Sequence, residues 1–89
     1  MKILISYDVS GIEDGNALER YIKSKYPNYW HGLDGTWIVS SMYSPRHIRD
    51  CVRGFLKVDG NLLVVDISGS QASWGGLNVK SANWLKDNL

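Results

Sequence analysis

The order in which strand patterns and helix patterns follow one another constrains this chain most strongly. Apolar and polar residues alternate where β-strands are expected, and apolar residues recur every three or four positions where helices are expected. The strand patterns cover residues 2–8, 28–33, 36–41 and 61–68, and the helix patterns cover residues 14–26, 44–56 and 80–88. This order predicts a ferredoxin-like α/β (α+β) fold, β-α-β-β-α-β, with a four-stranded antiparallel sheet and a short C-terminal helix.

The length of 89 residues predicts one domain, residues 1–89, with a single core. A formal net charge of +1 gives no global basic field, so any nucleic-acid contact needs a local patch. The only cysteine, Cys51, excludes an internal disulfide and a zinc site built on cysteines.

No apolar run approaches the ~20 residues of a membrane-spanning helix. The first residues, MKILISYDVSG, lack the pattern of a cleaved signal peptide. We therefore expect a cytoplasmic protein without a membrane partner.

The pair Asp34–Gly35 predicts a two-residue turn between the second and third strands. In the simplest register of such a hairpin, Leu33 lies opposite Thr36 and His31 lies opposite Ile38. This register predicts the face of the sheet on which each side chain lies.

The expected register puts Trp30, Trp37 and Val39 together on one face, as core residues. The opposite face, away from the two main helices, is expected to carry Leu4, Ser6, His31, Ile38, Leu62 and Val64. A face this apolar is not expected to stay in contact with water. We therefore expect a homodimer, with the C-terminal segment contributing to the cover.

Three aspartates are expected at one end of the sheet. In this topology the C-terminal ends of the first two strands meet the N-terminal ends of the last two, which gathers Asp8, Asp34 and Asp59. Oxygen ligands of this kind suit Mg²⁺. Asp34 and Asp59 each precede a glycine in a turn, which already explains them. Asp8 has no such explanation and is the candidate catalytic and metal-binding residue. Tyr7 and Ser10 beside it are candidates for binding nucleic acid or another ligand.

The second helix carries a basic stripe, with Arg46, Arg49, Arg53 and Lys57 spaced three or four residues apart and interrupted by Asp50. The arginines are candidate phosphate contacts. A solvated helix face is the alternative and commoner meaning of such a stripe.

Two aromatic residues in expected loops, Tyr43 and Trp74, are candidates for stacking on a base. The two histidines, His31 and His47, lack the spacing of metal ligands and are interpreted as packing or surface residues. Cys51 falls on the buried stripe of the second helix, where a thiol behaves as a small apolar group.

Five stretches carry a resemblance that covers nearly the whole chain. They are ISYDVSG at residues 5–11, YWHGLDGTWIVSS at 29–41, SPRHIRDCVRGFL at 44–56, NLLVVDISG at 61–69 and SANWLKDNL at 81–89. The pattern resembles a family of small bacterial and phage proteins called SinR-like, which look like distant relatives of the CRISPR-associated Cas-two proteins. The resemblance implies a ferredoxin-like fold and a homodimer.

The Cas-two resemblance also implies a role for Asp8, which matches the aspartate that ends the first strand in that family. Paired aspartates of the dimer would hold a divalent metal for phosphodiester cleavage, whereas other members hold DNA as scaffolds. This sequence departs from the family after Asp8, where Val9–Glu13 replaces a basic run. It also lacks the family's Gln- and Phe-containing second strand. The fold and the dimer therefore carry over better than the cleavage.

Three functions stay open at this point. The first is a Cas-two-like nucleic-acid-associated protein, either a Mg²⁺-dependent nuclease (a hydrolase acting through Asp8) or a relative that has lost activity. The second is a dimeric module that binds a nucleotide or signalling molecule through Tyr43 and Trp74. The third is a non-catalytic module that binds a protein through the open sheet face or a strand edge.

Overall fold

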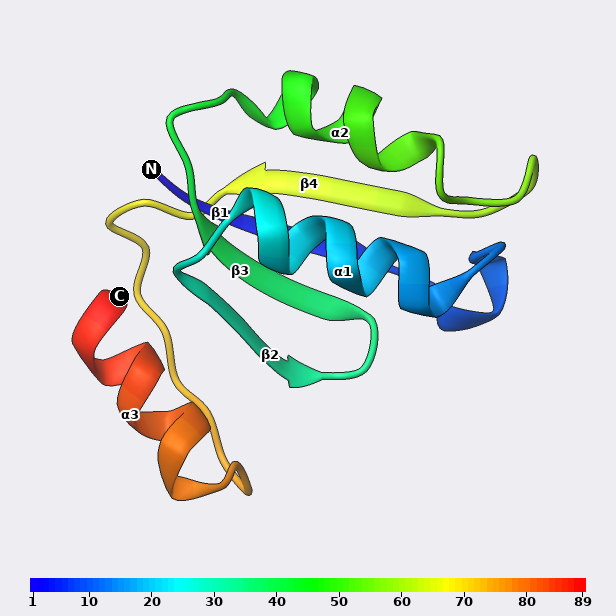
Figure 1. The fold of residues 1–89 in the computed structure, drawn as a ribbon. Coiled ribbons are helices and arrows are strands. Elements are labelled where there is room, and N and C mark those ends of the chain that lie inside the picture. The colour runs from blue at the N-terminus through cyan, green and yellow to red at the C-terminus, as the bar shows by residue number, and fades with distance from the viewer.

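The computed structural model describes all 89 residues and shows an α+β architecture with one four-stranded antiparallel sheet and three α-helices (Figure 1). The strands are β1 (Lys2–Tyr7), β2 (Tyr29–Leu33), β3 (Thr36–Ser40) and β4 (Leu62–Asp66). The helices are α1 (Gly15–Lys25), α2 (Pro45–Arg53) and α3 (Val79–Asn88), with a 3-10 turn, η1, at Val9–Gly11. The strands lie side by side in the order β2-β3-β1-β4, an arrangement compatible with the ferredoxin-like prediction.

Each helix begins where a side chain caps it. Asp14 Oδ1 accepts hydrogen bonds from the backbone N–H groups of Asn16 and Ala17, at 3.0 and 3.2 Å. Ser44 caps α2, and Asn78 caps α3 in the same way. These caps satisfy N–H groups that have no partner within the helix, so the predicted starts of the first two helices are confirmed.

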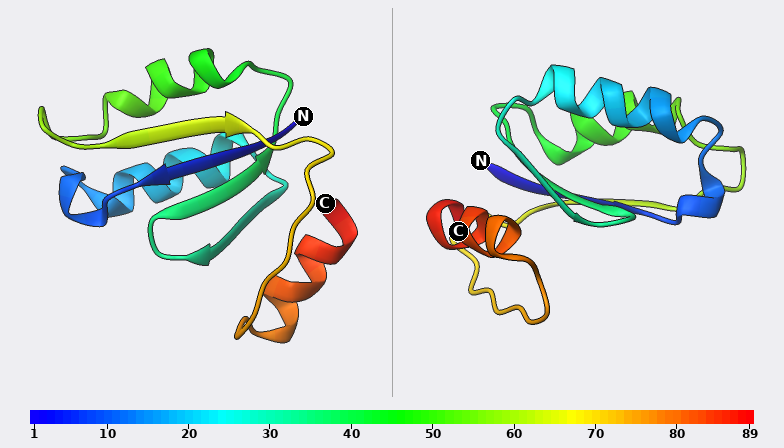
Figure 2. Two further views of the ribbon diagram at one scale, coloured as in Figure 1. Left: turned by 180° about the vertical axis from the view of Figure 1, so that it is seen from behind. Right: turned by 60° about the horizontal axis from the view of Figure 1, so that its bottom comes forward.

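Helices α1 and α2 cover one face of the sheet, which we call the helical face (Figure 2). The core between the helices and the strands is formed by Ile3, Ile5, Leu18, Ile22, Tyr26, Trp37, Val39, Ile48, Val52 and Leu56. Burial of each large aliphatic side chain contributes about 1.5–3 kcal/mol, so this layer supplies most of the hydrophobic stabilisation of the fold.

The predicted register of the hairpin is wrong beyond the turn. Trp30, rather than His31, lies opposite Ile38, and the register shifts between Trp30 and Leu33. Two residues of β2, His31 and Gly32, therefore face one residue of β3, which is a β-bulge. Alternation counted from the turn cannot reveal a bulge, because the extra residue reverses the side on which every earlier side chain lies.

The bulge moves Trp30 and His31 to the faces opposite to those predicted. The His31 ring stacks on Trp37 at a centroid distance of 3.7 Å, on the helical face. The Trp30 ring instead lies on the other face and folds over Gly32, where an added Cβ would sit 2.3 Å from Trp30 Cζ2. Gly32 is thus the residue type that this bulge requires.

The predicted faces of β4 are also reversed. Val64 lies opposite Ile5, so Leu62 and Val64 pack against the core of the helical face. Leu63 and Val65 lie on the other face and are 60% and 40% exposed. The first side chain of a strand that follows a loop can point to either face of the sheet. The pairing of β4 with β1 decides which of its side chains face the core.

The second face of the sheet, which we call the open face, is partly covered by the C-terminal segment (Figure 2). Leu85 of α3 packs against Trp30 and Ile38 in a small buried cluster. Trp30 Nε1 donates a hydrogen bond to the Ser81 carbonyl at 3.2 Å, which fixes α3 beside β2. The expected contribution of the C-terminal segment to the cover is therefore confirmed. None of the three helices combines the length and apolar content that a bilayer crossing requires.

Candidate functional site

The end of β1 meets the hairpin turn at one end of the sheet, as the topology predicts. The backbone N–H of Tyr7 donates a hydrogen bond to the Gly35 carbonyl at 2.9 Å. An added Cβ at Gly35 would come within 2.3 Å of the Tyr7 carbonyl oxygen, so only glycine permits this close approach. Asp8, the candidate catalytic and metal-binding residue, follows directly.

The Asp8 side chain is exposed and is not used as a helix cap. It precedes η1 but makes no capping hydrogen bond. The Asn61 side-chain amide donates a hydrogen bond to Asp8 Oδ2 at 3.0 Å, so this interaction orients the carboxylate and leaves Oδ1 open. An exposed and oriented carboxylate at a strand end can bind a cation or another polar ligand.

A small polar hollow of about 190 Å³ lies beside Asp8, between η1 and the loop that precedes β4. Asp59 and Lys57 line it, and Lys57 Nζ donates a hydrogen bond to the Ser10 carbonyl at 3.2 Å. Asp34 is not among its lining residues. The chain brings no three His, Cys, Asp or Glu side chains together closely enough to share a metal ion. The expected group of three aspartates is therefore not formed within one chain.

Tyr7 has a structural role at this end of the sheet. Its hydroxyl accepts a hydrogen bond from Trp37 Nε1 at 2.7 Å. Burial raises the pKa of Tyr7, and the hydrogen bond from Trp37 opposes this rise in part. The phenol therefore stays protonated at neutral pH and holds the core tryptophan in place.

The arginines of the predicted basic stripe differ in their surroundings. Arg53 donates hydrogen bonds to the carbonyls of Val58 and Gly60, at 2.9 and 2.6 Å, and so holds the loop after α2. Arg49 pairs with Asp50 at 2.8 Å, where both side chains are more than half exposed. Arg46 is exposed and takes part in neither of the two salt bridges of the chain. Arg46, together with Arg49, is thus the most accessible candidate for a phosphate contact.

The two loop aromatics do not share a site. The Tyr43 ring stacks on His47 at a centroid distance of 4.6 Å, and Lys25 Nζ lies 5.1 Å from its centre. Cys51 Sγ is 3.8 Å from His47 Nε2, in the same group on α2. Trp74 instead lines a groove on the open face that Tyr43 does not reach. A nucleotide site built on both rings is therefore not formed within one chain.

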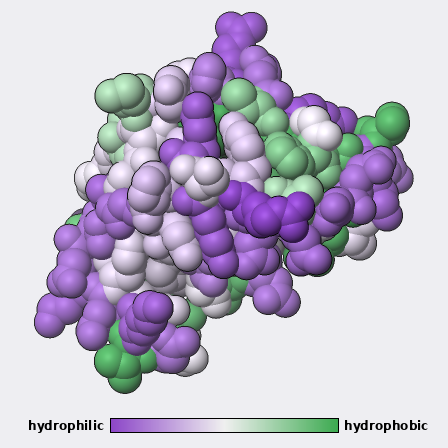
Figure 3. Space-filling model, in the orientation of Figure 1, coloured by the Kyte–Doolittle hydropathy of each residue, from purple (hydrophilic) through white to green (hydrophobic).

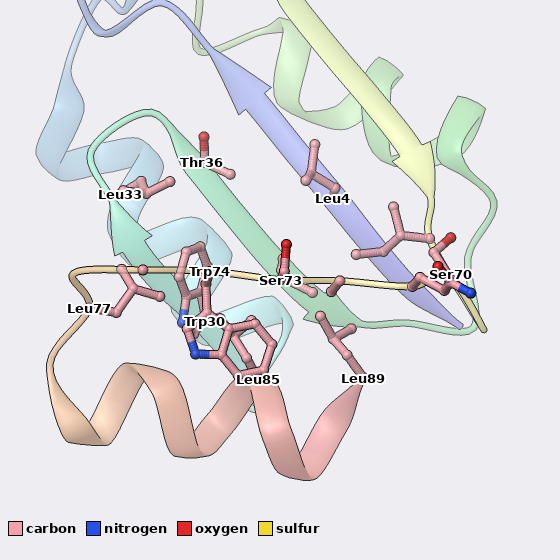
Figure 4. A pocket seen from close by; sticks show the side chains of 15 residues that line it. Leu4, Trp30, Leu33, Thr36, Ser70, Ser73, Trp74, Leu77, Leu85 and Leu89 are labelled. Atoms are coloured by element: carbon pink, nitrogen blue, oxygen red, sulfur yellow. The ribbon is translucent and has the colours of Figure 1, made fainter.

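The sequence did not predict that groove. It has a volume of about 450 Å³ and lies between the sheet, α3 and residues 70–77 (Figure 4). Ten of its fifteen lining residues are hydrophobic, among them Trp30 and Trp74. In the sequence, only Trp74 followed by Gly75–Gly76 indicated a binding surface here. Trp30, the other tryptophan of the groove, is predicted from the sequence to lie on the helical face.

Comparison with protein-family models, with curated proteins and with solved structures gives no match. The structure defines the class of the chain as a small α+β protein with a four-stranded antiparallel sheet. The resemblance to SinR-like and Cas-two proteins remains a prediction from the sequence.

Proposed function

We propose that this chain is a nucleic-acid-associated protein that acts as a homodimer, with the ferredoxin-like fold that its resemblance to SinR-like and Cas-two proteins implies. Within one chain, the element order and the strand order β2-β3-β1-β4 of the antiparallel sheet support this fold. The observation that carries the functional proposal is a separation of chemistry between the two faces of the sheet.

The helical layer is basic relative to the rest of the chain. Helices α1 and α2 each carry three basic residues and one acidic residue, a formal charge of +2 each, whereas the whole chain carries +1. The basic residues are Arg20, Lys23 and Lys25 in α1 and Arg46, Arg49 and Arg53 in α2. Hydrophilic residues cover most of the surface seen from this side (Figure 3). Such a layer can attract a phosphate backbone even when the total charge is small.

The open face supplies a surface for a second copy. Leu63 and Val65 of the edge strand β4 form an exposed strip that the C-terminal segment leaves uncovered, with the half-buried Ser6 of β1 opposite Leu63. We call this the bare strip. An exposed apolar patch on a sheet face favours contact with another protein surface. A symmetric pair packed face to face through it would bury Leu63 and Val65 of both copies and turn both basic helical layers outward.

A two-fold axis at the Asp8 end of the strip would also bring the two Asp8 carboxylates to one interface. Asp8 lies two residues beyond Ser6, at the end of the strand that borders the bare strip. Each copy supplies one carboxylate with an open oxygen, and Mg²⁺ binds one or two protein carboxylates and several waters. The residues therefore fit a shared magnesium ion, which would activate water for phosphodiester cleavage.

Binding of nucleic acid and its dependence on salt test the first part of the proposal. Wild-type protein is titrated with labelled single- and double-stranded RNA and DNA at several salt concentrations. We expect Arg46→Gln to lower the salt slope by about 1 and to weaken binding to all sequences alike. The matched control is Lys86→Gln, a basic residue of α3 outside the helical layer, which should bind as wild type. Absence of binding by wild type at low salt would exclude the proposal.

Cleavage tests the role of Asp8. The same nucleic acids are incubated with wild type and with Asp8→Asn, in Mg²⁺ and in chelator. We expect cutting by wild type in Mg²⁺ alone, and none by Asp8→Asn, which should still bind because the helical layer is intact. If neither protein cuts while both bind, Asp8 is not catalytic and the protein is a scaffold.

A further inference from the structure

The groove on the open face has the construction of a small-molecule site. Leu4, Trp30 and Ile38 of the sheet form its floor, Leu85 of α3 forms one wall, and Trp74 stands over it (Figure 4). Its volume of about 450 Å³ falls within the range of about 300–1,000 Å³ that is usual for ligand pockets. The bare strip is a separate part of the same face, because neither Leu63 nor Val65 lines the groove.

The lining selects against charged ligands. The five lining residues that are not hydrophobic are Thr36, Ser70, Gln71, Ser73 and Gly75, so no lining side chain is ionisable. A charged group inside the groove would lose water without gaining an opposite charge. Lys86 lines the adjoining hollow beside Trp74 but not the groove itself. A neutral ligand would not meet this cost, and the few hydroxyl and amide groups could orient it.

The two tryptophans select for flat molecules. Trp30 is buried and held by its hydrogen bond to Ser81, whereas Trp74 is 42% exposed, so its ring still has apolar surface to cover. Stacking on an aromatic side chain suits a planar ring system and depends little on its substituents.

Access to the groove is provided by residues 70–77, which we call the strap. Between Gln71 and Leu77 the strap makes no backbone–backbone hydrogen bond, so only side chains hold it against the sheet. Gly69 and Gly76 have φ angles of +73° and +71°, which glycine adopts without strain. A segment with so few backbone hydrogen bonds opens at low cost compared with the helices and strands.

We propose that this groove binds a neutral, flat and mostly apolar small molecule, held between Trp74 of the strap and the tryptophan-floored open face. The occupant is a small molecule rather than a second copy, because the strap and α3 already cover this half of the face and leave a hollow. The inference does not depend on nucleic-acid binding, which we assign to the helical layer.

The test uses two dyes with the same ring system. N-phenyl-1-naphthylamine is neutral, and 1-anilinonaphthalene-8-sulfonate carries an added sulfonate. Each is titrated into wild type, Trp74→Ala and Val58→Ala, and bound dye is followed by its fluorescence. Val58 is 96% exposed and lies outside the groove, so its variant is the matched control.

We expect saturable binding of the neutral dye to wild type and to Val58→Ala. Binding to Trp74→Ala should be at least about fivefold weaker, the lower end of the loss for one stacking side chain. The sulfonate dye should bind wild type at least about fivefold more weakly than the neutral dye. Circular dichroism should show that Trp74→Ala stays folded, since this residue lies in a loop.

Three dye-binding results would overturn the inference. They are equal binding of the neutral dye by wild type and Trp74→Ala, absence of saturable binding by wild type, and tighter binding of the sulfonate dye. Sedimentation equilibrium is run on the same variants. Conversion of a wild-type dimer to monomers by Trp74→Ala would show that a second copy fills the groove instead, and would overturn it as well.

Discussion

The two faces of the sheet use the same four strands for different purposes. On the helical face, ten buried side chains form one continuous core, whereas on the open face only Trp30, Ile38 and Leu85 are buried together. Leu33, Leu63 and Val65 stay exposed on or beside that second face. The comparison teaches that stability is concentrated on one face, which leaves the other free to form contacts with ligands or copies.

The largest expected effect comes from truncating the helical face. Ile22 is fully buried, so Ile22→Ala should lower the free energy of unfolding by about 2–5 kcal/mol. Leu63→Ala on the bare strip should change it by less than about 0.5 kcal/mol in the monomer, because most of that side chain is already in water. Urea denaturation at low protein concentration measures both. Equal losses would mean that the open face is as well packed as the helical face.

A smaller effect is expected where the bulge separates the two faces. In Gly32→Ala the new methyl group would overlap the Trp30 ring, so the ring must leave its place on the open face. We expect a loss of about 1–3 kcal/mol in the free energy of unfolding and a shifted indole N–H resonance of Trp30.

The control for the bulge variant is Gly15→Ala, at the start of α1. An added Cβ at Gly15 meets no atom within 4 Å, so this variant should be as stable as wild type or slightly more stable. If Gly32→Ala left both the stability and the Trp30 resonance unchanged, the bulge would not be what positions Trp30.

The smallest effect is a loss of stability at high pH that involves only the helical face. Burial, with a smaller contribution from Cys51, raises the pKa of Tyr21 to about 12, and burial also raises the pKa of Tyr26. Above about pH 10 the unfolded chain loses phenol protons that the folded chain retains, so the melting temperature should fall as pH rises through that range.

Tyr21→Phe tests this assignment. The variant should flatten the decline in melting temperature between about pH 10 and 12, because one of the retained protons is gone. An absorbance titration of wild type should show one phenol with a midpoint near 12 that is missing in the variant. An unchanged decline in Tyr21→Phe would assign the effect to other groups.

The sequence was sufficient to predict features that depend on local chemistry. Ser44 and Asp14 cap helices, Asp34–Gly35 forms the turn, and the three α-helices and four strands lie where the apolar spacing predicts. The face of the sheet on which each side chain lies was not predictable in the same way. It depends on a bulge at His31–Gly32 and on the pairing of β4 with β1, neither of which has a pattern of its own.

The candidate site was predicted only in part for the same reason. The position of Asp8 directly after β1 was predictable because it follows from the order of the elements alone, and its functional role stays a prediction. Arg53 was expected to contact phosphate, but it is committed to two carbonyl groups in the next loop. Such a contact between a side chain and a distant backbone depends on the path of the loop. The groove depends on the bulge, because the bulge places Trp30 on the open face. The sequence predicted Trp30 on the helical face, so it gave no indication of a groove.

The bulge at His31–Gly32 has an effect far from its own position in the chain. The bulge turns Trp30 to the open face, where its side chain donates a hydrogen bond to the Ser81 carbonyl of α3. Ser81 lies 51 positions from Trp30 in the sequence. Insertions and deletions in this strand are therefore not equivalent to those in an ordinary loop. Removal of one residue would leave the two-residue turn intact, yet would withdraw the tryptophan on which the C-terminal helix docks. Homologues should thus gain or lose Gly32 and the C-terminal helix together, as a single evolutionary unit.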